Sequence, residues 1–200
     1  MSGAVGEARR GGRTRSGSAH AAVLAAAAEL LDESGYGKLS IEGIAARSGV
    51  AKSTIYRWWR SKADLVMEAY TEVTARRVPG PDTGGVQEDL RVFLDTLYRV
   101  NANAGRARVL RGLMAEAQLD DGFRAAFQEW IQSRRTLMST ILMRGVERGE
   151  LAEDLDVEYT VDSVFGPFWY RLLVGHAELD PADAPKHVAQ LLRGAGYRAP

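Results

Sequence analysis

The chain has 200 residues, of which 46% are hydrophobic and 26% charged, as expected for a globular protein with one large or two small domains. It has no cysteine, which excludes disulfides, zinc–thiolate sites and thiol chemistry and suits a reducing cytoplasm. The formal net charge is zero, but residues 1–62 hold ten Lys or Arg against five Asp or Glu, an excess that suits a polyanionic partner or arises from chance scatter.

The first 17 residues are rich in Gly, Arg and Ser and predict a flexible basic tail. Their arginines precede an apolar run at residues 21–28, an order that superficially suggests a secretory signal. We reject a signal peptide because this run is mostly alanine and continues in helical register to Leu31. No apolar stretch approaches the roughly 18 residues that a membrane span requires.

Four helices are predicted between the tail and the first proline-rich segment, because apolar residues recur there with helical spacing. Ser40 and Ser61 are suited to accept hydrogen bonds from the free amides of a first helical turn. Gly35 and Gly49 are suited to end the preceding helix in a left-handed cap. The expected ranges are residues 18–34, 40–48, 51–59 and 61–78.

Residues 79–85 (PGPDTGG) form the clearest linker in the sequence. Every later segment has a helical pattern, with Asp121, Asp156 and Asp180 as expected N-caps and a kink expected at Gly166–Pro167. No stretch alternates with a period of two, so we predict an all-α fold. The later helices are expected at residues 86–103, 106–119, 122–148, 157–175 and 181–194.

Residues 41–59 (IEGIAARSGVAKSTIYRWW) carry the most informative spacing. A helix-turn-helix needs a small residue where two short helices touch, a glycine in the turn and an aliphatic residue on the inner face of the second helix. Ala45, Gly49 and Ile55 meet these needs. An ordinary helical hairpin is the weaker alternative. The expected remainder of the small core is Ile44, Val50 and Trp59.

The stretch from Val23 to Leu65 resembles the N-terminal part of the TetR family of bacterial transcription regulators nearly residue by residue, including GVAKSTIY and the following SKADL. Phe165–Asp180 resembles the second-last helix of one large branch of that family. The resemblance implies a homodimer, a palindromic operator and a C-terminal domain that binds a small effector. It also implies a cytoplasmic regulator whose two-part all-α fold pairs a three-helix DNA-binding domain with a larger helical domain.

The expected organisation follows from the helices and the resemblance together. A flexible basic tail is expected at 1–17, a helix-turn-helix domain at 18–62, a connecting helix at 63–78, a linker at 79–85 and an effector-binding and dimerisation domain at 86–200.

The residues of the third helix independently suit DNA, because the N-terminal end of a recognition helix enters the major groove. Lys52 and Arg57 can reach guanine or a phosphate, whereas the hydroxyls of Thr54 and Tyr56 suit phosphate oxygens. The predicted DNA-binding residues are Ser40, Arg47, Lys52, Ser53, Thr54, Tyr56, Arg57, Trp58 and Lys62.

Several of these positions keep an alternative. Lys62, at a helix start, is a natural phosphate ligand or only a solvated charge, and Arg47 could reach a base edge or remain a surface residue. Trp58 could pack on a sugar-phosphate edge or cover the small core, and the sequence does not decide. Arg9–Arg15 could lie in an adjacent minor groove or only raise nonspecific affinity.

Aromatic residues at helical spacing in the C-terminal part predict a core, and an apolar effector pocket if that core leaves space. Segment 160–174 is apolar on more than one face, and segment 182–194 contributes Val188, Leu191 and Leu192, so we predict that the last two helices are buried against a second subunit in a four-helix bundle. The predicted pocket residues are Phe93, Leu97, Leu113, Phe127, Trp130, Phe165, Phe168 and Trp169.

An enzyme is not expected. The three histidines lack metal-ligand spacing, and no nucleophile elbow, dinucleotide fingerprint or phosphate loop is present, so no catalytic residue, metal or cofactor is predicted. A helical adaptor that has lost DNA binding is the alternative function, against which the set Lys52–Lys62 argues. Repression is favoured over activation, because occluding a promoter needs no contact with polymerase.

Overall fold

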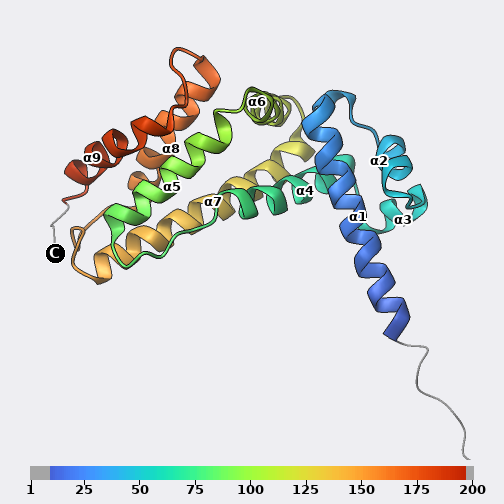
Figure 1. Cartoon of the computed structure of the whole chain (residues 1–200), viewed down its shortest axis with the longest axis horizontal. Coiled ribbons are helices and arrows are strands. Elements are labelled where there is room, and N and C mark those ends of the chain that lie inside the picture. The colour runs from blue at the N-terminus through green and yellow to red at the C-terminus, as the bar shows by residue number, and fades with distance from the viewer. Residues whose placement is uncertain (1–9, 197–200) are drawn as a thin grey trace, which may run out of the picture. The chain divides into compact units, whose positions relative to one another are not determined.

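The computed structural model describes the backbone of residues 10–196 (Figure 1), all of whose regular elements are helical, as the sequence predicts. No helix in this range has the length and apolar composition of a membrane span. The elements are α1 (Arg10–Ser34), η1 (Tyr36–Lys38), α2 (Ile41–Ser48), α3 (Lys52–Trp58), α4 (Lys62–Arg77), α5 (Val86–Asn101), α6 (Ala104–Leu119), α7 (Asp121–Glu147), α8 (Val157–Val174), η2 (Pro181–Asp183) and α9 (Ala184–Gly194).

The chain forms two compact units, residues 1–71 (the N-terminal unit) and 72–200 (the C-terminal unit). Their boundary lies inside α4 rather than at the proline-rich segment. Helix α1 begins at Arg10, eight residues before the predicted start, so part of the expected tail is helical. Extending an existing helix costs far less than starting one, and this lets an alanine-rich helix continue into a glycine-containing sequence. Residues 1–9 lie outside the described part of the chain.

The capping residues of the helix-turn-helix do what the sequence predicts. The Ser40 hydroxyl accepts a hydrogen bond from the Gly43 amide at 3.1 Å and so caps α2. Gly49 ends α2 with a φ of 70°, and its amide donates to the Ala45 carbonyl at 3.0 Å. The tight turn brings Ile44 of α2 and Ile55 of α3 into the fully buried core of the N-terminal unit.

Two local predictions differ from the structure. Gly35 has the expected positive φ of 76°, but its ψ of 168° is extended, so the chain leaves α1 without a left-handed helical cap. Asp120 rather than Asp121 caps α7: its carboxylate accepts from the Phe123 amide at 2.6 Å, whereas Asp121 pairs with Arg124 inside the first turn. Helix α8 continues through Pro167, and the kink expected there remains a prediction.

The proline-rich segment 79–85 connects α4 to α5 without helical structure and is held by hydrogen bonds at several points. Arg134 of α7 donates to the Val78 carbonyl at 2.7 Å, and Arg144 of α7 donates to the Pro81 carbonyl at 2.6 Å. The amide and hydroxyl of Thr83 both donate to the carboxylate of Asp89, at 2.7 and 2.8 Å. Since Asp89 is fully buried, these bonds hold the segment along its length.

The C-terminal unit is a helical bundle in which α5 packs against α9, α6 against α7, and α7 against α8. Helix α7 approaches the start of α5 so closely that a Cβ at Gly145 would lie 2.9 Å from the side chain of Val86. The buried face of α8 joins this core through Val161, Val164 and Phe168.

Candidate nucleic-acid interface

Helix α3 separates an inner from an outer face, as a recognition helix must. Ile55 is fully buried and Trp59, directly after the helix, is 4% exposed. The outer face, which we call the α3 surface, consists of the exposed side chains of Lys52, Ser53, Tyr56 and Arg57. Thr54 is half-buried beside them. With Trp58, six of the predicted DNA-binding residues therefore lie on one short helix.

Lys52 is held by an acidic residue of the preceding helix. Its ammonium forms an ion pair with the Glu42 carboxylate in the first turn of α2. The hydrogen bond from Lys52 lowers the pKa of Glu42, and Glu42 in turn raises the pKa of Lys52. Both groups are therefore charged at neutral pH, and the cation is partly neutralised before any DNA arrives.

Arg47 also has partners within the N-terminal unit. Its guanidinium donates to both carboxylate oxygens of Glu33 in α1, at 2.7 and 3.0 Å, and lies 3.5 Å from Glu29. These hydrogen bonds lower the pKa of Glu33 and raise that of Arg47. The arginine thus fastens α2 to α1, and its predicted reach to a base edge requires these bonds to be given up.

Lys62 points inward rather than into solvent. Its ammonium lies 3.3 Å from the carbonyl oxygens of Tyr36 and Leu39 and 3.9 Å from the centre of the Tyr36 ring. These contacts tie the start of α4 to η1, in keeping with a cation stabilised by carbonyl dipoles and an aromatic face. Its predicted phosphate contact remains a prediction.

Trp58 is half-buried over the small core, with its ring centre 5.4 Å from that of His20 and 5.6 Å from that of Trp59. The indole N–H of Trp59 donates to the Glu68 carboxylate at 2.6 Å, and His20 Nε2 lies 3.6 Å from the other oxygen of that carboxylate. His20 of α1 and Glu68 of α4 therefore fix the end of α3. Sequence reasoning missed both, because neither belongs to a local motif.

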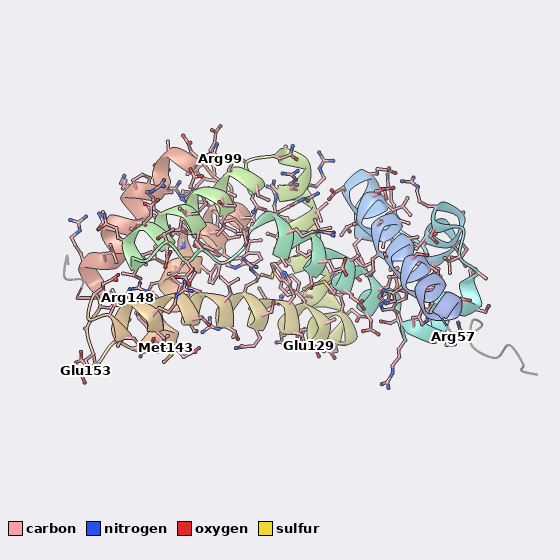
Figure 2. All side chains as sticks on the ribbon, turned by 60° about the horizontal axis from the view of Figure 1, so that its bottom comes forward. Arg57, Arg99, Glu129, Met143, Arg148 and Glu153 are labelled. Carbon is pink, nitrogen blue, oxygen red and sulfur yellow. The ribbon has the colours of Figure 1, made fainter. Side chains whose placement is uncertain are left out.

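Two cations without an ion-pair partner among the described residues lie at the C-terminal end of α3. Arg57, labelled at the edge of the N-terminal unit in Figure 2, and Arg60 are exposed, and neither forms an ion pair with any described residue. Arg60 was not among the predicted DNA-binding residues. These two guanidiniums are available to an incoming phosphate or base edge without first leaving a carboxylate.

The predicted pocket residues come together in the C-terminal unit. Six of the eight are buried, and Phe165 and Trp169 are half-buried. Phe127 lies 5.3 Å from Trp130 and 6.4 Å from Trp169 between ring centres, while Phe93 meets Phe165 at 5.9 Å. These ring contacts join α7 to α8 and α5 to α8, and Leu97 of α5 and Leu113 of α6 are buried in the same unit. No three potential metal-ligating side chains gather anywhere in the described residues.

A polar pair formed by the buried Tyr98 and the half-buried His187 adjoins these side chains. The Tyr98 hydroxyl lies 3.0 Å from His187 Nδ1, and the two rings stack with centres 6.1 Å apart. Burial raises the pKa of Tyr98. Burial also lowers the pKa of His187 below its ordinary value of 6.5, an effect that the Ser163 backbone partly opposes and Arg171 reinforces. His187 is therefore neutral in the folded protein at neutral pH.

Acid should destabilise the C-terminal unit through His187. Because the folded pKa is the lower one, the unfolded chain takes up the proton first as the pH falls below 6.5, and stability is lost in that window. We expect the melting temperature to drop between about pH 7.5 and about pH 5.5, and to drop less in His187→Gln. His176→Gln, at an exposed histidine, is the control. Equal pH dependence in wild type and His187→Gln would contradict this expectation.

Two protein-family models match the chain. The model described as "Bacterial regulatory proteins, tetR family" matches residues 23–69, from α1 into α4. The model described as "Tetracyclin repressor-like, C-terminal domain" matches residues 80–191, more than half of the chain. Together the two matches cover both units.

Individual proteins agree with the family models. YdeS of Bacillus subtilis, an uncharacterized HTH-type transcriptional regulator, is 33% identical over 184 residues, which are 92% of each chain. The solved structure of the TetR family transcription regulator SCO0332 has a TM-score of 0.79 and 33% identity, covering 91% of this chain and 99% of that one. FadR from Bacillus subtilis, solved in complex with stearoyl-CoA, is similar in fold, with a TM-score of 0.69 and 22% identity over 88% of this chain and 98% of that one.

Proposed function

Because the chain belongs to the TetR family of bacterial regulatory proteins, and is thus a DNA-binding transcriptional regulator and not an enzyme, we propose that it is a ligand-responsive repressor. In this proposal a homodimer binds a palindromic operator and leaves it when a small molecule binds the C-terminal unit. Family membership removes the support for an adaptor that has lost DNA binding. Repression needs only that the bound dimer block a promoter.

The observation that carries the DNA contact is the α3 surface, where two hydroxyls and two cations are exposed on the helix that follows the turn. Such a helix fits the major groove with its N-terminal residues against base edges. Two copies in a dimer would present their α3 helices about 34–36 Å apart, which matches successive major grooves on one face of a duplex.

A second apolar face on α8 supports the homodimer. Exposed apolar side chains form a stripe along α8 opposite its buried face: Tyr159, Tyr170, Leu173 and Val174. Tyr159 lies eleven residues, or about three turns, before Tyr170. Gly166 and Pro167, also exposed, lie between them and allow close approach of another helix. Exposed apolar stripes of this kind mark interaction surfaces, and a two-fold dimer covers the same stripe on both copies at once.

The aromatic cluster of the C-terminal unit supports an apolar or amphipathic effector. Small-molecule sites are lined mainly by such side chains, and FadR from Bacillus subtilis, with a similar fold, was solved with stearoyl-CoA. Helix α4 contains the boundary between the units and would carry the signal. The effector must bind the DNA-free state more tightly, typically by about 1–3 kcal/mol of coupling.

Selection of genomic DNA fragments on the purified protein, at two salt concentrations and followed by sequencing, tests this function. An enriched inverted repeat is expected, and the genes beside it would narrow the choice of effector. Salt-sensitive binding without an enriched motif would contradict sequence-specific regulation, because phosphate contacts alone produce such binding. A ligand that binds the protein and leaves its affinity for the repeat unchanged would contradict the switch.

Arg57→Ala should weaken binding to the selected repeat by about 1–3 kcal/mol and relax the preference at one base position in each half-site. The reason is that Arg57 is exposed on α3 and has no carboxylate partner among the described residues. Binding titrations with the repeat and single-base variants would measure both effects. Arg108→Ala, which removes an exposed arginine from the C-terminal unit, is the charge control. A loss that is equal for every sequence would identify Arg57 as a phosphate ligand instead.

A further inference from the structure

Glu42 is an acidic side chain placed among the groups proposed to meet DNA. It lies two residues after the cap Ser40, in the first turn of α2, and pairs with Lys52, the first residue of α3. The Glu42 side chain is 65% exposed and that of Lys52 is 48% exposed, so the pair is open to solvent. Exposed pairs of this kind add little to folding stability, so stability gives little reason for a carboxylate at this position.

We propose that Glu42 limits the DNA affinity of this protein by competing with a backbone phosphate for Lys52. The inference rests on the proposed contact between Lys52 and DNA. A phosphate that approaches Lys52 must displace the Glu42 carboxylate or share the ammonium with it. Either outcome leaves one negative charge beside another, which offsets much of what the lysine contributes.

Counterion release makes this competition measurable. Each phosphate neutralised by a cation releases ions from B-DNA, and the logarithm of the affinity falls by about 0.9 per decade of salt for each such contact. When Lys52 leaves Glu42 for a phosphate, the carboxylate takes up a solvent cation, and this cancels the release. Without the Glu42 charge, the slope of the logarithm of the affinity against the logarithm of the salt concentration should become steeper by about 0.9, as for one additional phosphate contact.

Glu42→Gln should therefore raise the affinity for a random-sequence duplex. If the gain vanishes near 1 M salt, it amounts to about fivefold at about 0.15 M salt and about fifteenfold at about 0.05 M salt. Glutamine keeps the size of the side chain and removes only the charge. Glu88→Gln is the matched control, because Glu88 pairs with Arg91 on α5 in an exposed contact of 2.6 Å and its loss changes the net charge equally.

The experiment titrates a labelled random-sequence duplex of about 30 base pairs with wild type, Glu42→Gln, Lys52→Ala, the double variant and Glu88→Gln at several salt concentrations. Tighter binding by Glu42→Gln is expected. The steeper salt dependence should appear with Lys52 present and be absent in the Lys52→Ala background. If Glu42→Gln steepened the salt dependence both with Lys52 and with Lys52→Ala, general charge repulsion would replace the proposed competition. An equal gain of affinity in Glu88→Gln would lead to the same conclusion.

Lys52→Ala separates this inference from the function on which it rests. Weaker binding by Lys52→Ala together with unchanged or weaker binding by Glu42→Gln overturns the inference alone and makes Glu42 a residue that orients Lys52. Lys52→Ala that binds as tightly as wild type removes Lys52 from the interface and overturns both the predicted contact and the competition.

Discussion

Leu173→Glu is expected to convert the proposed dimer into a monomer and to weaken binding to an inverted repeat strongly. Leu173 is 47% exposed and lies between Tyr170 and Val174 on the apolar stripe of α8. A carboxylate there would have to be buried without a partner at the contact between subunits, which is strongly unfavourable. Size-exclusion chromatography with light scattering measures the mass, and titration of the repeat measures the binding.

The expected loss of affinity is large, because a monomer engages a single half-site. Two linked binding events typically exceed one alone by about 10²–10⁴-fold, so the variant should lose roughly that factor. Leu119→Glu is the control: Leu119, at the end of α6, is 83% exposed and lies outside the α8 stripe. A dimeric Leu173→Glu that binds the repeat normally would exclude this stripe as the interface.

Trp59→Ala is expected to lower the free energy of unfolding of the N-terminal unit by about 3–5 kcal/mol, because it empties a large volume in a small core. Trp59 is 4% exposed, contacts the rings of His20 and Trp58, and donates its indole N–H to Glu68. A loss of this size is a large part of the stability of a typical domain. DNA binding should fail with it, since α3 would lose its support.

Hydrogen exchange of the amides in α2 and α3, combined with denaturant titration, would report this loss for the N-terminal unit separately. Trp59→Phe keeps an aromatic ring but not the donor, so it should cost only about 1–3 kcal/mol. Trp58→Ala, at the half-buried neighbour, should cost less than Trp59→Ala. Equal losses at the two tryptophans would contradict the assignment of Trp59 to the core.

Local features of the fold could be predicted because local residues cause them. The serine cap at Ser40, the turn at Gly49 and the inner face with Ile55 each depend on residues a few positions apart. The aromatic cluster was also predictable as a set, since helical spacing places its members on buried faces. Whether Trp58 meets DNA was not predictable, because it depends on packing against His20 of α1.

Charged partners could not be predicted, because periodicity within a helix does not reveal contacts between helices. Arg47 pairs with Glu33 across 14 positions, Lys52 with Glu42 across 10, and Lys62 reaches Tyr36 across 26. Each cation looked available for DNA from its own neighbours in the sequence. In the structure each has ligands from another element, and this distinguishes them from Arg57.

The anchored segment 79–85 has a mechanical consequence. A flexible connection would let the end of α4 move independently of the helices that follow it. Here Arg134 and Arg144 fasten Val78 and Pro81 directly to α7, and the buried Asp89 fastens Thr83 to α5. A displacement of α7 at Arg134 would therefore pull on Val78, the residue that directly follows α4, unless this hydrogen bond broke.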